Sequence, residues 1–261
     1  MASGPTILSL LWGFSIVASA TAALRLYQLD LNRIYRFFFV YLLFSTVQSL
    51  ILFSFAFSFH VASGKYAIVY LIFAPFSWIF YVLVVLELYS LVLKNYSGIY
   101  SLGRWTLYGA LLFSVAVSIL SLIPSWGNEP YRLLFWCLTV ERGVVFSLVI
   151  FLLLILIFLS RYPLALSRNI IVHCIVYTIF FLSTTMTILV RNVVGHEVMR
   201  ALNDAMMITS ASCCLVWIFF LTRAGETRII TFHHNWSAQD EQRLIDQLSN
   251  INSTLLRAAR K

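Results

Sequence analysis

Seven long apolar runs, separated by short polar connectors, dominate this sequence of 261 residues. They lie at about 6–24, 37–59, 66–93, 105–123, 133–160, 170–190 and 204–222. Each run is long enough to cross the roughly 30 Å hydrocarbon core of a bilayer as an α-helix, which rises about 1.5 Å per residue. Backbone polar groups must be satisfied inside lipid, so runs of this length predict helices and not strands. The expected fold is an all-α, polytopic membrane bundle of about seven transmembrane helices.

The composition agrees with a chain whose main solvent is lipid. Hydrophobic residues make up 61% and charged residues 11%, against about 45–50% and about 25% in soluble domains. The net charge is +8, but Lys and Arg stand singly at the ends of apolar runs, so no nucleic-acid-binding patch is predicted. The four cysteines lie inside apolar runs without a C-x-x-C pair, which indicates packing residues and neither a zinc site nor a disulfide framework.

The basic residues also predict the orientation, because cytoplasmic loops are enriched in Lys and Arg. Thirteen of the 18 basic residues fall on one side of the predicted membrane, and Arg142 lies within a run. The other side has only four, at positions 65, 132, 191 and 200. We therefore expect a multi-pass protein of the cell membrane with its N-terminus outside and its C-terminus in the cytoplasm.

The chain divides into a seven-helix transmembrane domain, residues 1–222, and a cytoplasmic tail, residues 223–261. In the tail, Leu244, Leu248, Ile251 and Leu255 recur at helical spacing, which predicts an amphipathic helix within 237–260. One interpretation is a docking surface or short coiled coil for a cytoplasmic protein partner. The other is a helix that lies on the inner leaflet or packs under the bundle.

Small residues form stripes on several of the predicted helices, where they would let neighbouring helices approach closely. The stripes are Ser15, Ser19 and Ala22 or Ala23; Ala110, Ser114 and Ser118; and Ser210 with Cys213 or Cys214. We interpret them as packing surfaces within the bundle. A contact face of a homo-oligomer is the alternative.

Ionisable residues inside the runs are the first candidates for function, since a charge there costs about 2.5–3.5 kcal/mol on insertion scales. Glu141 and Arg142 are adjacent, so their side chains point about 100° apart and cannot face one partner. We expect Glu141 to pair with one of two outer arginines, and Arg142 with Glu197 or Asp204. The predicted outer group is Glu141, Arg142, Arg191, Glu197, Arg200 and Asp204. It is either a ligand-binding pocket for a small charged molecule or an ion-pair network that fixes helix register.

A second polar group, Glu87, His173 and Arg168, falls near the predicted inner face. It would suit a membrane enzyme acting on lipid if the three side chains converged. His173 stands alone on an apolar helix, so we interpret it as a hydrogen-bonded packing residue and not as a ligand. The sequence has no H-E-x-x-H motif, phosphate-binding loop or nucleophile elbow. No catalytic residue, metal site or cofactor is predicted, which favours a protein that is not an enzyme without excluding one.

The third run carries aromatic residues from Trp78, a polar inner end at Glu87-Leu88-Tyr89 and then a basic connector, Lys94 to Arg104. In this it resembles the seven-helix sensor regions that precede bacterial histidine kinases, although no kinase domain follows here. Three segments, Arg25 to Tyr27, Tyr35 to Phe44 and Leu255 to Lys261, resemble a group of uncharacterised bacterial seven-helix proteins of similar length. That second resemblance implies no assigned activity.

The combined prediction is a sensor-like or accessory signalling protein that passes the state of an outer pocket to a partner through the tail helix. A transporter or channel subunit, a lipid-acting membrane enzyme and a structural subunit of a membrane complex are the alternatives. An inverted repeat or broken helices would favour the transporter. Convergence of the inner-face group would favour the enzyme.

Overall fold

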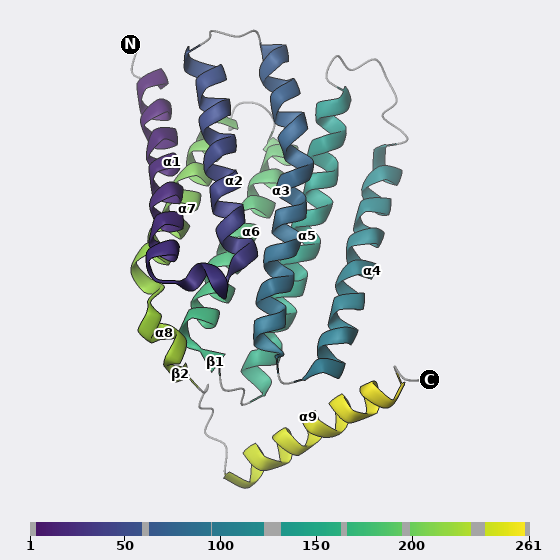
Figure 1. Ribbon diagram of the computed structural model, residues 1–261. Coiled ribbons are helices and arrows are strands. Elements are labelled where there is room, and N and C mark those ends of the chain that lie inside the picture. The colour runs from purple at the N-terminus through teal and green to yellow at the C-terminus, as the bar shows by residue number, and fades with distance from the viewer. Residues whose placement is uncertain are drawn as a thin grey trace.

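The computed structural model describes residues 4–58, 63–94, 96–122, 132–162, 166–194, 199–230 and 238–258. Its long helices are α1 (Gly4–Gln28), α2 (Arg36–Phe53), α3 (Ser63–Val92), α4 (Ser97–Leu122), α5 (Arg132–Arg161), α6 (Arg168–Val194) and α7 (Met199–Phe220). Figure 1 shows them side by side in one bundle, with the two chain termini at opposite ends. We call these the N-terminal end and the tail end.

Short elements and one further helix gather at the tail end. They are the 3₁₀ turn η1 (Leu31–Arg33), α8 (Arg223–Thr227), the antiparallel two-residue strands β1 (Leu166–Ser167) and β2 (Ile229–Ile230), and α9 (Ala238–Ala258). A π-helical turn, η2 (Ser54–Ser58), follows α2. The all-α fold class is confirmed.

Six helices, α1, α2, α3, α5, α6 and α7, are long and apolar enough within the described residues to cross a membrane. The chain is therefore a multi-pass integral membrane protein. The helix α4 is equally long, but its described part begins with polar and small residues and carries Arg104, so it is not among the six. The seventh crossing and the orientation remain predictions.

The surface of the bundle supports contact with lipid. Large apolar side chains stand exposed along the helices, among them Leu10 on α1, Ile72 on α3, Leu112 on α4 and Phe219 on α7. In water a soluble protein rarely leaves apolar patches of this extent open. Hydrocarbon is the solvent that suits this surface.

Close packing explains the small-residue stripes on two of the interfaces. The helix α1 lies against α7 and α2, and Ala22 and Ala23 are buried there. Between α4 and α5, the Ser114 hydroxyl donates a hydrogen bond to the Gly143 carbonyl at 2.7 Å. Small side chains thus allow helix contact at both places.

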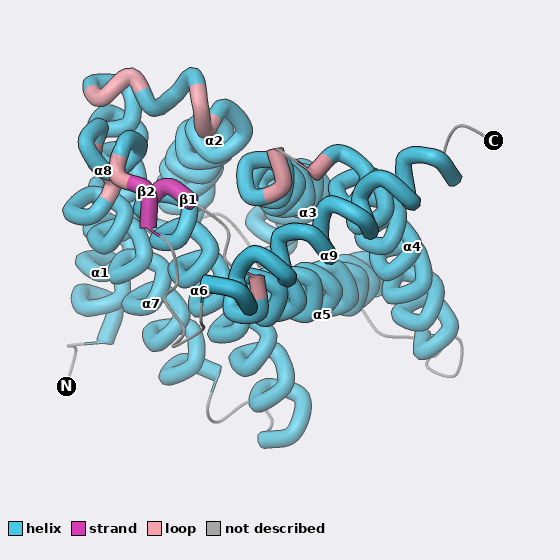
Figure 2. Tube along the Cα trace, turned by 90° about the horizontal axis from the view of Figure 1, so that it is seen from below, coloured by secondary structure: helices cyan, strands magenta, loops and turns pink. Residues whose placement is uncertain are grey.

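The tail helix α9 packs under the bundle against α4, and Figure 2 shows it lying across the tail end. Leu248 is 2% exposed and belongs to the main core, while the Gly98 N–H donates to the Asn252 side-chain oxygen at 2.7 Å. Ile251 differs from the prediction, since it is 45% exposed and Asn252 takes its place facing the bundle. The amphipathic helix is confirmed, and its cytoplasmic location remains a prediction.

Candidate functional site

A cavity of about 460 Å³ lies between α1, α2, α3 and α7. Its lining residues come from the first halves of α1 and α3, from the first half and middle of α7 and from the last part of α2, which places it toward the N-terminal end. The lining side chains are Trp12, Ser15, Ser49, Tyr66, Asn203, Met206, Met207 and Ser210. We call this space the serine cavity. Hydroxyl and amide groups alternate there with aromatic and thioether surface, and none of these eight residues is charged.

A smaller chamber of about 70 Å³ adjoins the serine cavity deeper in the bundle. The two spaces share Ser15, Ser49 and Ser210 as lining residues. We call the smaller space the midbundle chamber. Its other lining residues are Ser19, Tyr41, Leu42, Ser45, Phe180, Cys214 and Trp217. Hydroxyl groups thus continue from the N-terminal half of the bundle toward its middle.

Below the chamber, aromatic rings surround His173, which is 1% exposed. The ring centroid of His173 lies 4.5 Å from that of Tyr35 and 4.7 Å from that of Phe38. Tyr177 stacks on the imidazole at 6.0 Å, and Trp217 lies 6.1 Å away. We call these five residues the aromatic cluster. The packing role predicted for His173 fits this environment, but neither ring nitrogen has a hydrogen-bond partner among the described residues.

At the tail end, a carboxylate ties three separate parts of the chain together. The side-chain oxygen of Glu226 accepts hydrogen bonds from the Tyr35 hydroxyl at 2.9 Å and the Asn169 amide at 3.1 Å. Asn169 is fully buried, and its amide also donates to the Thr222 carbonyl at 2.8 Å. We call Tyr35, Asn169, Thr222 and Glu226 the tail clasp.

The clasp keeps the Tyr35 phenol in its neutral, donating form. Burial raises the pKa of Tyr35 well above its ordinary value, and the neighbouring Glu226 carboxylate raises that pKa further. Tyr35 also belongs to the aromatic cluster. The phenol therefore joins the buried interior to the first residues of the tail.

Two backbone features hold the clasp in place. Gly225 is buried so closely against Asn169 that a side chain there would collide with the amide. Nearby, the β1–β2 ladder pairs Leu166 with Ile230, and the Arg168 N–H donates to the Arg228 carbonyl at 3.1 Å. The segment after α7 is thereby fixed against the start of α6.

Glu87, the first member of the predicted inner-face group, caps α2. Its carboxylate accepts hydrogen bonds from the backbone N–H groups of Phe37 at 3.0 Å and Phe38 at 3.1 Å. The first N–H groups of a helix have no hydrogen-bond partner within the helix. The helix dipole, which is positive at this end, also stabilises a negative charge there. Tyr35 precedes α2, but its side chain does not cap the helix. Glu87 on α3 supplies this cap instead.

Arg168 places its guanidinium 5.8 Å from the ring centroid of Phe220. His173 contacts the Phe38 ring, while Glu87 binds the backbone of the same residue. Glu87 and His173 therefore share Phe38 as a partner, whereas Arg168 contacts a different residue. Joint action of Glu87, His173 and Arg168 stays a prediction.

The predicted outer group is described only in part. Arg191, Glu197 and Arg200 have side chains outside the described residues. Glu141 accepts a hydrogen bond from the Tyr70 hydroxyl at 2.8 Å, which joins α5 to α3. Arg142 and Asp204 form no ion pair with each other, and one carboxylate oxygen of Asp204 is buried without a hydrogen-bond partner among the described residues. None of the described members of this group lines the serine cavity.

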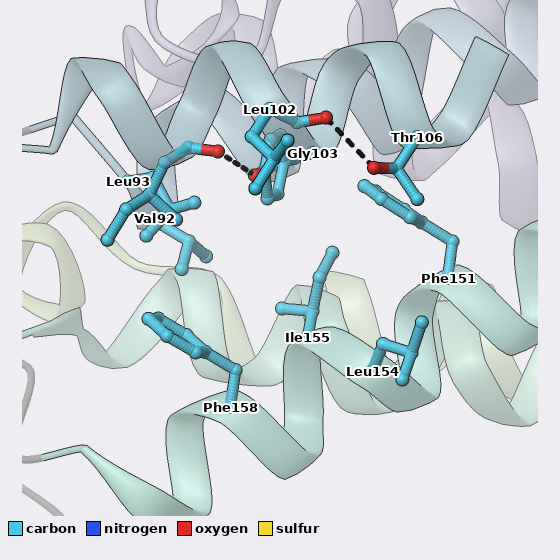
Figure 3. A pocket seen from close by; sticks show the side chains of 11 residues that line it. Val92, Leu93, Leu102, Gly103, Thr106, Phe151, Leu154, Ile155 and Phe158 are labelled. Carbon is cyan, nitrogen blue, oxygen red and sulfur yellow. Dashed lines mark hydrogen bonds between the residues drawn. The ribbon is translucent and has the colours of Figure 1, made fainter. Parts of the chain in front are cut away.

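A third space, of about 210 Å³, lies between α3, α4 and α5 and is almost wholly apolar. Figure 3 shows Phe151, Leu154, Ile155 and Phe158 of α5 on one side, facing Gly103 and Thr106 of α4. The Thr106 hydroxyl is bonded to the carbonyl of Leu102 at 3.0 Å. This apolar cavity offers no directional contacts for a polar ligand.

Sequence reasoning missed both the serine cavity and the tail clasp. Ser15 and Ser210 were recognised as small residues, but a small residue can line a cavity as well as a close contact. Tyr35, Asn169 and Glu226 stand at the ends of apolar runs and are far apart in the chain. Their position at run ends was the only available signal, and it gives no pairing.

The chain matches no protein-family model, and neither the curated proteins nor the solved structures include a significant match.

Proposed function

We propose that this protein is a sensor-like membrane protein that binds a small neutral molecule in the serine cavity and passes its occupancy to the tail. The observation that carries the proposal is the cavity itself. Its volume of about 460 Å³ falls within the roughly 300–1,000 Å³ of small-molecule sites, which combine apolar walls with a few polar groups. Transport, lipid chemistry and a purely structural role have no comparable support.

The proposed topology is seven crossings of the cell membrane, with the N-terminus outside and the tail in the cytoplasm. An odd number of long helices agrees with the termini at opposite ends of the bundle (Figure 1). Seven of the thirteen basic residues lie at or near the connectors that meet at the tail end, and the other six belong to the tail itself. Such an excess is typical of the cytoplasmic side.

The lining favours a neutral and partly apolar ligand. Serine hydroxyls and Asn203 can donate and accept hydrogen bonds, whereas Trp12, Met206 and Met207 offer apolar contact. A charged ligand would need an opposite charge in a site of low dielectric. The described lining residues provide none, so a neutral ligand replaces the charged one that the outer group of residues suggested.

A continuous set of contacts leads from the cavity to the tail. Ser210 in the cavity and Trp217 in the aromatic cluster lie two turns apart on α7. Trp217 packs on Phe38 at 4.7 Å, and the cluster includes Tyr35, whose hydroxyl binds Glu226 in α8. A shift of α7 caused by a ligand would thus be transmitted to the clasp that holds the tail.

Ligand binding is tested by native mass spectrometry of the protein purified in mild detergent. We expect a retained small molecule on the wild type, and its loss from Ser15→Phe, because a phenyl ring would fill the cavity. Thr21→Phe is the matched control, since Thr21 lies on the same helix and is exposed. Retention of the same molecule by Ser15→Phe would contradict the proposed site.

Transmission to the tail is tested by hydrogen–deuterium exchange with and without the retained molecule. We expect removal of the molecule to change amide exchange in residues 223–230 and in α9, while exchange at exposed Thr106 on α4 stays the same. Equal exchange in the tail under both conditions would leave a binding protein without a signalling role.

The topology is tested by adding an epitope tag to either terminus. In intact cells we expect an antibody to reach the N-terminal tag and not the C-terminal one. Permeabilised cells serve as the control, where both tags are accessible. The opposite pattern would reverse the proposed orientation.

A further inference from the structure

The midbundle chamber is polar although it lies in the middle of a membrane helix bundle. Its volume is about 70 Å³, and Ser19, Tyr41 and Ser45 add hydroxyl groups to the three serines that it shares with the serine cavity. Space of this size is well above the roughly 10–15 Å³ that a cavity needs to hold one water molecule. Cavities lined by apolar residues stay dry, whereas polar ones of sufficient size hold water.

Trp217 gives an independent indication of a ligand in the chamber. Its side chain lines the chamber and is 3% exposed, yet the indole N–H has no hydrogen-bond partner among the described residues. Buried donors of this kind are almost always paired, either with the protein or with ordered water.

We propose that the midbundle chamber is a water-binding site, continuous with the serine cavity, which hydrates the bundle interior as far as Trp217. The shared serines form the connection between the two spaces. Water bound there would accept the indole hydrogen bond and bond to the surrounding hydroxyls. This inference does not depend on a ligand in the serine cavity.

The hydrated passage ends at the aromatic cluster. Phe38 lies 4.7 Å from Trp217 and 4.7 Å from His173, and Tyr177 lies 4.9 Å from Trp217, all between ring centroids. Rings in direct contact leave no room for a water column. Beyond them, Tyr35 is already bonded to Glu226. The passage is therefore open toward the N-terminal end and closed toward the tail end.

Two adjacent native cysteines provide a matched pair of reporters for this passage. Cys214 lines the chamber, whereas Cys213 does not and instead faces the Val176 carbonyl at 4.0 Å. Both are 5% exposed and lie at the same depth on α7. The difference that the experiment uses is contact with the chamber, which Cys214 has and Cys213 lacks.

The experiment uses two variants of the full chain in lipid nanodiscs, each with a single cysteine at position 213 or 214 and alanine at the other three cysteine positions. The probe is Ag⁺ in chloride-free buffer, which bonds to the sulfur as the thiol releases its proton and which cannot pass through apolar packing. Thiols left unreacted are then counted with a maleimide in denaturant. Reaction of both cysteines in the denatured state is the control.

We expect Cys214 to react at least about tenfold faster than Cys213, because thiol reactivity requires access from water. Adding Ser15→Phe should lower the Cys214 rate to that of Cys213, and adding Thr21→Phe should leave it unchanged. Equal rates for the two cysteines, or a Cys214 rate that Ser15→Phe does not affect, would overturn the proposal. Fast Cys214 reaction without any retained small molecule would support the hydrated passage and count against the proposed ligand site alone.

Discussion

At the tail end of the bundle, the buried amide of Asn169 finds its partners in the protein, whereas nearer the middle the indole of Trp217 borders open space. Asn169 is fully buried and makes hydrogen bonds to both Glu226 and Thr222. Trp217, five residues before Thr222 of the clasp, lacks a partner for its indole N–H among the described residues and lines the midbundle chamber. The proposed function needs this difference, because it requires a closed end that holds the tail and an open half that would admit a small molecule.

The largest effect is expected at α9, which covers the tail end of the bundle. Leu248→Ala should weaken docking of α9 by about 3 kcal/mol, because truncation of a buried leucine costs about 2–5 kcal/mol. Amide exchange in α9 should then be about 100-fold faster. Ile251→Ala is the control on the same helix, and its exposed side chain should give little change. Equal exchange in the two variants would mean that Leu248 does not anchor α9.

The second test compares the free energy of unfolding of one variant in the tail clasp with that of one variant at the serine cavity. Asn169→Ala should lower the free energy of unfolding by about 2 kcal/mol, because it leaves the Thr222 carbonyl and the Glu226 carboxylate with fewer buried donors. Ser210→Ala, at the serine cavity, should change that energy by less than about 0.5 kcal/mol. Reversible unfolding in mixed micelles gives both values. A similar loss in the two variants would remove the distinction between the two regions.

The smallest effect is expected at the α2 cap. Glu87→Gln should cost about 1 kcal/mol, since the amide keeps one acceptor but loses the charge that favours the helix N-terminus. Asp246→Asn, on the exposed side of α9, is the control and should be nearly neutral. The same unfolding measurement applies. If Glu87→Gln were also neutral, Glu87 would be free for a role other than capping.

The seven apolar runs were sufficient to predict the helices, because a helix that must satisfy its backbone in lipid needs a long uninterrupted run. The periodic leucines of the tail likewise predicted α9. The rotation of α9 was less predictable: Ile251 fits the apolar period, but packing against α4 turns Asn252 toward Gly98 instead. A helical period of 3.6 leaves neighbouring stripes nearly equivalent until a second helix selects one of them.

The candidate sites were less predictable than the helices. Glu87 and Glu141 stood out as charges inside apolar runs, yet their partners are the backbone of α2 and the hydroxyl of Tyr70. A charge in a run indicates that a partner exists and does not identify it. A backbone N–H group in particular cannot be identified as a partner from the sequence, because almost every residue has one.

By itself, the sequence determined that this chain crosses a membrane as helices and ends in an amphipathic segment, because solvent and backbone hydrogen bonding act locally along the chain. Only the tertiary structure decided that Ser15, Ser49 and Ser210 border a cavity and that Tyr35, Asn169 and Glu226 meet at the tail end. These residues belong to helices that are distant in sequence. Their meeting depends on which helix faces pack together, and that is settled by the fit of the whole bundle.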